Sequence, residues 1–346
     1  MTDIKANPLL VEVTRGDLIE SRHRGAVVVV DEDGKIVAGW GDVDRLIYPR
    51  SAVKPFQAMV SVESGAFDAF NLTEGELALH SASHNGEEDH VGQVKNWLDK
   101  IGLSVNDLEC GTHLPMWISR NPGYQGAFAG SCPLHNNCSG KHAGFLTTAR
   151  YMGVSLSGYI NPEHPVQQAT KRLIADMTGV NCEDMPVAMD ACRAPTFGLP
   201  LQRFAYGLAR LGSGKGLGAG RTGAAERVCR AMRAFPWNVA GTGRPETLLM
   251  ADKDFAGIAK CGAEGVYALT LPQQGMGLAL KVDDGSDRAA HVIAMAVLHH
   301  LGVLNNKAMT RLSDLAQPPI RNWAGQDVGI MRCAKNSFLQ KENSSI

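Results

Sequence analysis

Residues 48–55, Tyr48-Pro-Arg-Ser-Ala-Val-Lys-Pro55, place a serine hydroxyl three residues before a lysine at a predicted loop-to-helix junction. Positions i and i+3 share one face of a helix, so Ser51 Oγ and Lys54 Nζ can meet where the first backbone N–H groups lack partners. A lysine activates a serine only when burial or a neighbouring cation lowers the lysine pKa. The alternative is a helix-capping serine beside a solvated lysine, and this stretch alone does not exclude it.

Two further short motifs follow this one along the chain, Ser83-His-Asn and Lys260-Cys-Gly. Penicillin-recognising serine acyl-enzymes combine S-x-x-K with a Ser-x-Asn triplet on a loop of a helical domain and a Lys-x-Gly triplet on a late strand. All three motifs occur here in that order. They favour an acyl-transfer site over a capped helix.

Strand-like and helix-like segments alternate in blocks. Strands rich in β-branched residues are predicted at 9–14, 25–31, 35–40, 265–271 and 276–283. Helical periodicity is predicted over 52–64, 74–81, 87–102, 142–152, 164–178, 200–211 and 222–234, and again from about residue 287. We therefore expect an α+β fold in which 1–50 and 236–346 form an antiparallel sheet domain, 51–235 form an inserted helical domain, and the site lies in the cleft between them.

Composition narrows the class of partner. The chain has 346 residues, 44% apolar and 20% charged, with a formal net charge of −1, so we expect a small-molecule substrate rather than nucleic acid. The first residues, MTDIKANPLL, lack a basic region followed by an apolar one, and the longest apolar stretch, 289–304, is too short to span a bilayer. We expect no membrane segment, a cytoplasmic location and eight cysteines that are free thiols.

The glycine-rich segment 212–223, GSGKGLGAGRTG, resembles nucleotide-binding loops only superficially. Its G-x-G-x-x-G has no preceding strand, and Lys215 is followed by Gly rather than Ser or Thr. We expect a mobile surface loop there.

Polar residues gather in three other predicted loops. In 81–90, SASHNGEEDH, Ser83 offers a second hydroxyl, and His84 and Asn85 are candidates to bind the substrate; an Asn-Gly turn is the plain alternative. The segment 131–142, SCPLHNNCSGKH, is rich in Cys, His and Asn, and 189–195 contains Asp190 and Cys192. Because no C-x-x-C occurs, spacing alone does not indicate a zinc site.

Taken together, these motifs and in particular Asn136-Asn-Cys-Ser-Gly-Lys-His142 and Lys260-Cys-Gly-Ala-Glu-Gly265 resemble the L-asparaginases of the rhizobial type, class 3 or asparaginase II family, from about residue 8 to 335. The resemblance implies a fold like that of serine β-lactamases and penicillin-binding proteins. It also implies a homodimer and the hydrolysis of L-asparagine to L-aspartate and ammonia.

The resemblance further assigns site residues. It implies two Ser–Lys tandems, Ser51 with Lys54 and Ser83 with Lys260. It also implies one zinc ion (Zn²⁺) near the active site, and its ligands would be Cys138, Lys141 and Cys192, with Asp190 close by.

We expect Ser51 to attack the side-chain carboxamide, neutral Lys54 to take its proton, and Ser83 with Lys260 to protonate the leaving amine. A cationic Lys260 would lower the pKa of Lys54, and Arg50 would bind the substrate α-carboxylate.

Several alternatives stay open at this stage. The same elements serve a glutaminase, a β-lactam hydrolase or a D-amino-acid peptide hydrolase, and a non-enzymatic metal or amino-acid sensor could keep the fold. The sequence also leaves open which serine is the nucleophile and what the zinc does, although substrate positioning is favoured.

Overall fold

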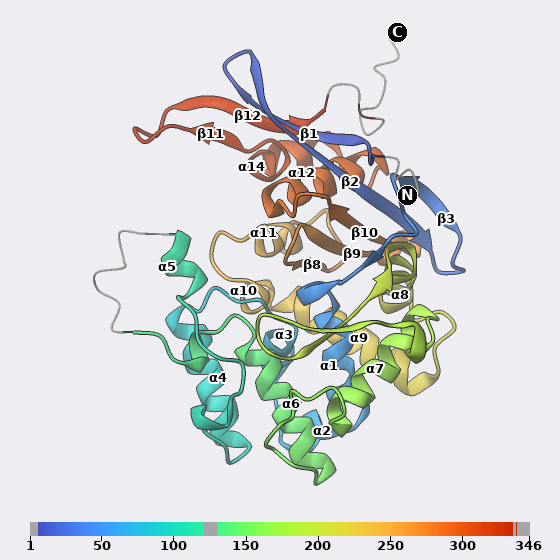
Figure 1. Ribbon diagram of the computed structural model, residues 1–346, viewed down its shortest axis with the longest axis vertical. Coiled ribbons are helices and arrows are strands. Elements are labelled where there is room, and N and C mark those ends of the chain that lie inside the picture. Colours follow the sequence, from blue (N-terminus) through green and yellow to red (C-terminus); the bar gives the residue numbers. More distant parts are fainter. Residues whose placement is uncertain (1–5, 121–129, 335–336, 338–346) are drawn as a thin grey trace.

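A computed structural model describes residues 6–120, 130–334 and 337 (Figure 1). It contains an antiparallel sheet in the order β11-β12-β1-β2-β10-β9-β8, with β3 paired to the other edge of β2. N-terminal and C-terminal strands therefore share one sheet, and the predicted α+β class is confirmed. The strands are β1 (Leu9–Arg15), β2 (Leu18–Asp31), β3 (Ile36–Trp40), β8 (Ala259–Gly262), β9 (Val266–Leu271), β10 (Met276–Val282), β11 (Pro319–Arg321) and β12 (Asp327–Cys333).

Strand β2 pairs with strands from both ends of the sequence, β1 and β10. Its inner half, Ala26–Val30, is fully buried and pairs with β10, Val28 lying opposite Ala279. Its outer half alternates between half-buried and exposed residues and pairs with β1 in a hairpin at the top of Figure 1. The sequence predicted only 25–31 as a strand, because residues 20–24 are a polar run without the apolar residues that mark a strand.

The inserted part of the chain is mostly helical and lies below the sheet in Figure 1. It contains η1 (Arg50–Val53), α1 (Lys54–Glu63), α2 (Ala66–Ala69), α3 (Glu74–His80), α4 (Glu88–Lys100), η2 (Val105–Asp107), α5 (Met116–Arg120), η4 (Pro133–His135), α6 (Ser139–Met152), α7 (Pro165–Thr178), η5 (Cys182–Asp184), α8 (Leu201–Ser213), α9 (Ala219–Ala234), α10 (Pro236–Val239) and α11 (Pro245–Ala251). After β10 the chain adds α12 (Asp287–His300), α13 (Asn306–Arg311) and α14 (Ser313–Ala316), and η6 (Pro272–Gln274) joins β9 to β10.

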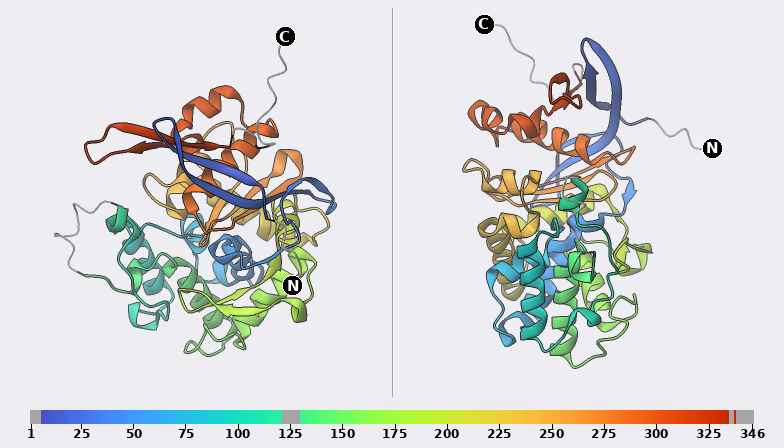
Figure 2. Two further views of the ribbon diagram at one scale, coloured as in Figure 1. Left: turned by 45° about the horizontal axis from the view of Figure 1, so that its top comes forward. Right: turned by 90° about the vertical axis from the view of Figure 1, so that its left-hand side faces the viewer.

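Helix α1 lies at the centre of the helical part. Its residues from Lys54 to Ser61 are all buried, and it contacts α3, α6, α7 and α9 (Figure 2). A helix that is buried on all sides must be apolar nearly all round, so a lysine at its first position is unusual and needs a polar partner.

Helix α8 packs directly on the sheet, against β2, β9 and β10. Gly277 allows this close approach, because a Cβ at this position would lie within 3.0 Å of backbone atoms of Ala205 and Ala209. One apolar core therefore runs through the sheet and the helices. The division of the chain at residues 50 and 235 stays a prediction.

Two local predictions are wrong. The segment 212–223 is not a loop throughout, since α9 begins at Ala219 and Gly218 is its N-cap. Helix α6 begins at Ser139 rather than near residue 142, because Cys138 already occupies the N-cap position. Glycine and serine lower helix propensity, so both helix starts were hidden from a periodicity argument.

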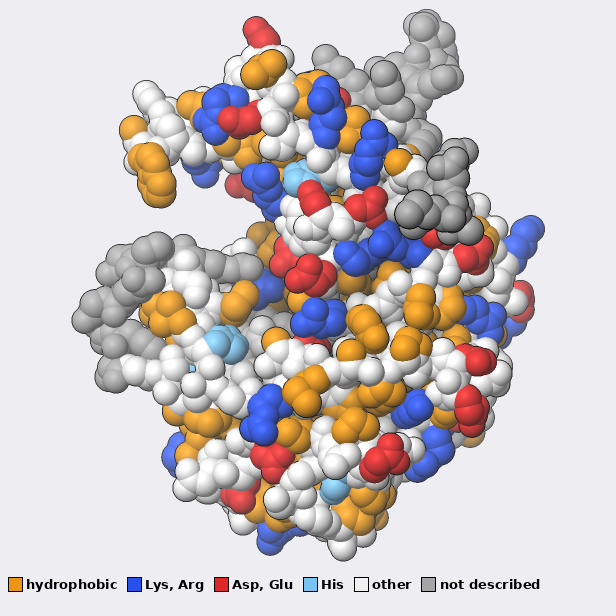
Figure 3. Space-filling view, viewed as in Figure 1, with side chains coloured by type: hydrophobic (Ala, Val, Ile, Leu, Met, Phe, Trp, Pro, Cys, Tyr) orange, Lys and Arg blue, Asp and Glu red, His pale blue; other side chains and the backbone are white. Residues whose placement is uncertain are grey.

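Short strand pairs that the sequence did not predict fix two loops: β4 (Leu46–Ile47) with β7 (Leu199–Pro200), and β5 (Val187–Met189) with β6 (Pro195–Phe197). All eight cysteines are free, as predicted. Among the described residues no helix combines the length and apolar character needed to cross a bilayer. On the face shown in Figure 3, acidic and basic side chains are interspersed.

Candidate active site

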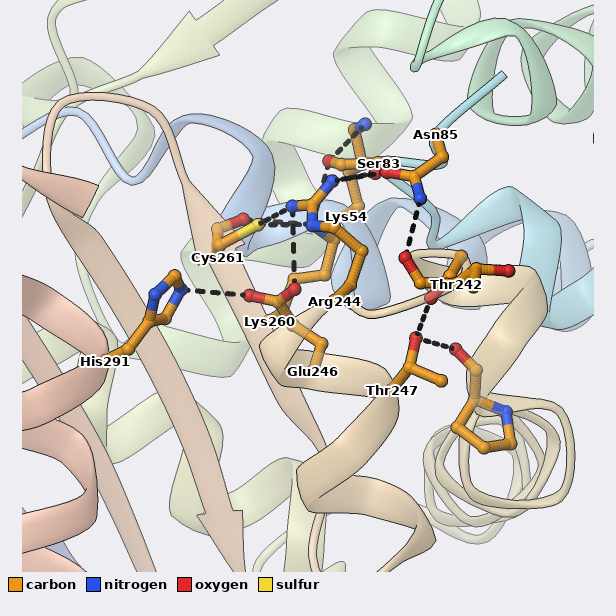
Figure 4. Close-up of polar contacts among 12 residues, drawn as sticks. Lys54, Ser83, Asn85, Thr242, Arg244, Glu246, Thr247, Lys260, Cys261 and His291 are labelled. Atoms are coloured by element: carbon orange, nitrogen blue, oxygen red, sulfur yellow. Dashed lines mark hydrogen bonds and ion pairs between the residues drawn. The ribbon is translucent and has the colours of Figure 1, made fainter. Parts of the chain in front are cut away.

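Three distant segments meet at the hydroxyl of Ser83. This serine follows α3, Lys54 opens α1, and Lys260 lies on β8. The Nζ atoms of Lys54 and Lys260 lie 3.0 and 2.8 Å from Ser83 Oγ, and all three side chains are buried (Figure 4). The structure thus brings Ser83 and Lys260 together across 177 positions of sequence.

Ser51 occupies a different environment. It is half-buried in η1, and within the described ranges its hydroxyl makes no hydrogen bond. The expected hydrogen bond between Ser51 and Lys54 is therefore not formed in this state. Lys54 Nζ instead contacts Ala82 O at 2.5 Å and Cys138 Sγ at 3.1 Å, because these acceptors surround its buried amine. Ser51 is the more accessible hydroxyl of the two.

The direction of each hydrogen bond at Ser83 Oγ depends on whether the lysine beside it is charged or neutral. A hydroxyl accepts up to two hydrogen bonds and donates one, so Ser83 donates to a lysine only if that amine is neutral. Burial lowers the pKa of Lys260; the neighbouring Cys261 opposes this shift, and the charge on Lys54 adds to it. The expectation that Lys260 acts on Lys54 in the same way stays a prediction.

Strand β8 packs against the η1 turn, which carries Ser51, at Gly262. A Cβ at this position would approach the Pro49 carbonyl oxygen to less than 3.0 Å and would lie 3.3 Å from Ala52 N. The Lys-x-Gly motif therefore needs its glycine for close contact between β8 and η1.

Arg50 pairs with Asp190. Its Nε and Nη2 atoms lie 3.0 and 2.7 Å from Asp190 Oδ1, and Arg50 has the left-handed φ of +55° that non-glycine residues rarely adopt. Such conformations persist where surrounding contacts enforce them, and they often mark functional sites. The ion pair connects the turn that carries Ser51 to the loop that carries Cys192.

His84 and Asn85, the candidate substrate-binding residues, are both bonded within the protein. His84 is fully buried, with Nε2 2.9 Å from Ser139 Oγ and Nδ1 accepting from Gly86 N, and its ring stacks on His90. Burial lowers the pKa of His84, which is neutral at pH 7. Both ring nitrogens have protein partners, so in this conformation the ring supports the loop and offers no nitrogen to a ligand.

Asn85 ties its loop to the segment before α11. Its Nδ2 donates to Glu87 Oε1 at 3.0 Å and to Thr242 O at 3.1 Å, and its Oδ1 accepts from Arg244. Glu87, which the sequence could not distinguish from a helix-start charge, also accepts from the Thr242 backbone N–H and hydroxyl. The loop is therefore rigidly fixed next to Ser83.

Sequence reasoning missed Arg244 and Glu246. Both are buried next to Lys260 (Figure 4). No motif marks them, and a charged pair beside a proline reads like an ordinary helix start. The only available signal was the short run Gly241-Thr-Gly-Arg244, whose glycines indicate a turn but not its surroundings.

The residues expected to bind zinc also converge. Lys141 Nζ lies 2.8 Å from Cys192 Sγ, and a hydrogen bond from Cys138 together with the Lys141 charge keeps the pKa of Cys192 well below its usual value, against the effect of burial. Two sulfurs, one of them a thiolate, are donors that zinc prefers, and the lysine amine completes a set of three. These residues therefore fit a zinc ion.

The lysine in this set has a chemical cost. Although burial acts in the opposite direction, the negative charge of Cys192 raises the pKa of Lys141, so only a bound metal would remove its proton. No group of three or more His, Cys, Asp or Glu side chains in the described ranges could hold a metal, and any metal site here depends on this lysine.

A profile of the L-asparaginase II family matches residues 11–333. A search of curated proteins finds no match.

The similar solved structures are distant. A β-lactamase from Mycobacterium bovis is 13% identical with a TM-score of 0.41, over 80% of this chain and 94% of that one. Mglu in its tris and glutamate form is 14% identical with a TM-score of 0.39, over 81% of this chain and 59% of Mglu. A mutant of simvastatin synthase (LovD) from Aspergillus terreus is 12% identical with a TM-score of 0.39, over 78% and 88%. At these TM-scores the likenesses support no argument about chemistry.

Proposed function

The protein belongs to the L-asparaginase II family, and we propose that it hydrolyses L-asparagine to L-aspartate and ammonia through a serine acyl-enzyme. Family membership supports the reaction class, amide hydrolysis. The observation that carries the finer proposal is the position of Ser83 Oγ between the amines of Lys54 and Lys260. Lys54 follows the more accessible Ser51 by three residues.

In this mechanism the nucleophile is Ser51 and its base is Lys54. Lys54 must lose a proton first, and the array supports a route: Lys54 passes its proton to Ser83, and Ser83 passes its own to Lys260. Lys260 can receive the proton only in its neutral form, and burial favours this form because it lowers the pKa of Lys260. Neutral Lys54 then takes the Ser51 proton as Ser51 Oγ attacks the carboxamide carbon, and backbone N–H groups of η1 stabilise the oxyanion.

The same array serves the leaving group. As the tetrahedral intermediate collapses, Lys260 returns its proton through Ser83 to the departing amine, and ammonia leaves. The reverse transfer then helps a water molecule to attack the acyl-enzyme and release aspartate. Ser83 thus relays protons in both half-reactions.

Arg50 and Asp190 would recognise the amino-acid end of the substrate. Arg50 uses Nε and Nη2 on Asp190, and its third nitrogen, Nη1, makes no hydrogen bond within the described ranges. An α-carboxylate would pair with Arg50, and an α-ammonium would pair with Asp190. Asn85 holds the Ser83 loop, so its contribution to substrate binding would be indirect.

Zinc would be held by Cys138, Lys141 and Cys192, whose donor atoms fit it. When bound, it would supply a Lewis-acidic position for a water or a substrate group. The chain's own contribution is geometric: Cys138 touches Lys54, and Asp190 touches Arg50, so the ligand set is continuous with the substrate-binding groups. A homodimer and a cytoplasmic location remain proposals.

The test compares ammonia release from L-asparagine and L-glutamine with opening of a chromogenic β-lactam. We expect asparagine to be hydrolysed with the highest kcat/KM. Ser51→Ala and Lys54→Arg should each remove nearly all activity, since arginine keeps the charge but cannot act as a base. Matched controls are Ser157→Ala and Lys307→Arg, both at exposed positions. Substantial activity in Ser51→Ala would exclude Ser51 as the nucleophile, and preference for glutamine or a β-lactam would assign a different substrate.

A further inference from the structure

A buried carboxylate, that of Glu246, lies near Lys260, and the mechanism above does not use it (Figure 4). Glu246 lies in the first turn of α11 and has no solvent exposure. Its Oε2 lies 3.5 Å from Arg244 Nη2, and its Oε1 lies 3.4 Å from His291 Nε2 (Figure 4). Neither oxygen makes a hydrogen bond within the described ranges.

Such a group is costly to bury. An ionised carboxylate loses its hydration on burial, and its ion pairs must offset that loss if it is to stay charged. Arg244 nevertheless keeps the pKa of Glu246 well below its usual value, against the effect of burial, so the carboxylate is charged at neutral pH. A fully buried carboxylate that stays charged beside a lysine with a lowered pKa is a candidate for a functional role.

Arg244 connects this carboxylate to the catalytic segments. Its Nη1 lies 3.3 Å from both Ser83 O and Asn85 Oδ1, and its Nη2 lies 3.5 Å from Cys261 Sγ. One guanidinium therefore touches the loop that carries Ser83 and the strand that carries Lys260. Its remaining Nε is buried without a hydrogen-bond partner.

The charges in this region are unbalanced without Glu246. The amines of Lys54 and Lys260 and the guanidinium of Arg244 surround the Ser83 segment, and the carboxylate of Glu246 acts on both Lys260 and Arg244. The ionisable groups that act on Glu246, Arg244 and Lys260 come from α1, the loop before α11, β8, β9 and α12: Lys54, Arg244, Lys260, Cys261, Tyr267, Asp287 and His291.

We propose that Arg244 and Glu246 are a pair of positioning residues, which sets the charge around Lys260 and so the lowest pH at which Lys260 can accept a proton from Ser83. This inference rests on the proposed function, because it gives the pair a role in the same proton relay. Neither residue touches the substrate. Each acts through Lys260.

The two members of the pair act with opposite sign. Burial dominates the lowered pKa of Lys260, while Glu246 raises this pKa and Arg244 lowers it. Removing the carboxylate therefore favours neutral Lys260, and activity should persist to lower pH. Removing the guanidinium should have the opposite effect, and removing both should nearly cancel.

The experiment measures kcat/KM for L-asparagine against pH in the wild type, Glu246→Gln, Arg244→Met and the double variant. We expect the acid limb to move down by about one pH unit in Glu246→Gln, up by a similar amount in Arg244→Met, and back towards the wild-type position in the double variant. Glu226→Gln is the matched control, since it removes one carboxylate from an exposed position on α9 and should leave the limb unmoved.

A second readout does not depend on activity. In protein labelled with ¹⁵N-lysine, the Lys260 Nζ resonance, assigned by its loss in Lys260→Met, reports the pKa directly. We expect the same signs of shift. Unmoved Lys260 pKa values in the variants would overturn the inference whether or not asparagine is the substrate. If the wild type does not hydrolyse asparagine, the proposed function fails on its own, and the NMR titration still decides the charge coupling.

Discussion

A single added methyl group at Gly262 should disturb the contact between strand β8, which carries Lys260, and the η1 turn, which carries Ser51. In Gly262→Ala the new Cβ would lie less than 3.0 Å from the Pro49 carbonyl oxygen and 3.3 Å from Ala52 N. Both neighbours are backbone atoms, so neither can rotate away. Either β8 or the η1 turn must move, and Lys260 or Ser51 moves with it.

The size of the effect follows from this overlap. Relief of the contact needs a displacement of roughly 1 Å, and a misplacement of this size can reduce kcat/KM by about 100-fold. The accompanying strain should cost about 1–3 kcal/mol in the free energy of unfolding. Gly262 does not have a positive φ, so the loss would come from crowding and not from backbone strain.

The assay is ammonia release from L-asparagine, run beside thermal unfolding. Gly223→Ala is the matched control: Gly223 is in α9, a Cβ there would meet nothing within 4 Å, and the change should stabilise the helix by about 0.5–1 kcal/mol without affecting activity. Wild-type kcat/KM in a folded Gly262→Ala protein would refute the argument that β8 must approach η1 closely.

Three further outcomes are expected. Ser83→Ala combined with Lys260→Met should lose about as much activity as the worse single variant, and additive losses would show that the two residues act independently. Freshly purified protein should contain about one zinc per chain, held more weakly as pH falls, and Cys192→Ser but not the control Cys182→Ser should lose it; a metal-free wild type would contradict the site. Burial lowers the pKa of His90 to about 4, so between pH 4 and about 6.5 the unfolded state binds more protons than the folded state. The free energy of unfolding should therefore decrease as the pH is lowered through this window. Urea titrations of His90→Gln should show a slope shallower by about 1.4 kcal/mol per pH unit, whereas an unchanged slope would mean that His90 is not buried in its neutral form.

Much of the site was predictable because its motifs are local. Ser51 and Lys54 are three residues apart, and the triplets that begin at Ser83 and Lys260 keep their order in the chain. The valine-rich run in β2 and the apolar strands near the C-terminus likewise marked the sheet, because a strand buried on both faces must be apolar. The sequence therefore indicated the fold class and the residues that would meet.

Only the tertiary structure decided how these residues are partnered. Lys54 is hydrogen-bonded to Ser83 rather than to Ser51. Arg50 forms an ion pair with Asp190, 140 positions away in the sequence. His84 is buried, and both of its ring nitrogens have protein partners. The tertiary structure also brought Glu246 close enough to Lys260 for their charges to interact, and no sequence motif marks this pair. The physical reason is that burial and ion pairing depend on which side chains the sheet and α1 bring together. Pairing of β2 with β10 brings segments from both ends of the chain into one sheet, next to the helical part. No local sequence pattern specifies which side chains become neighbours as a result.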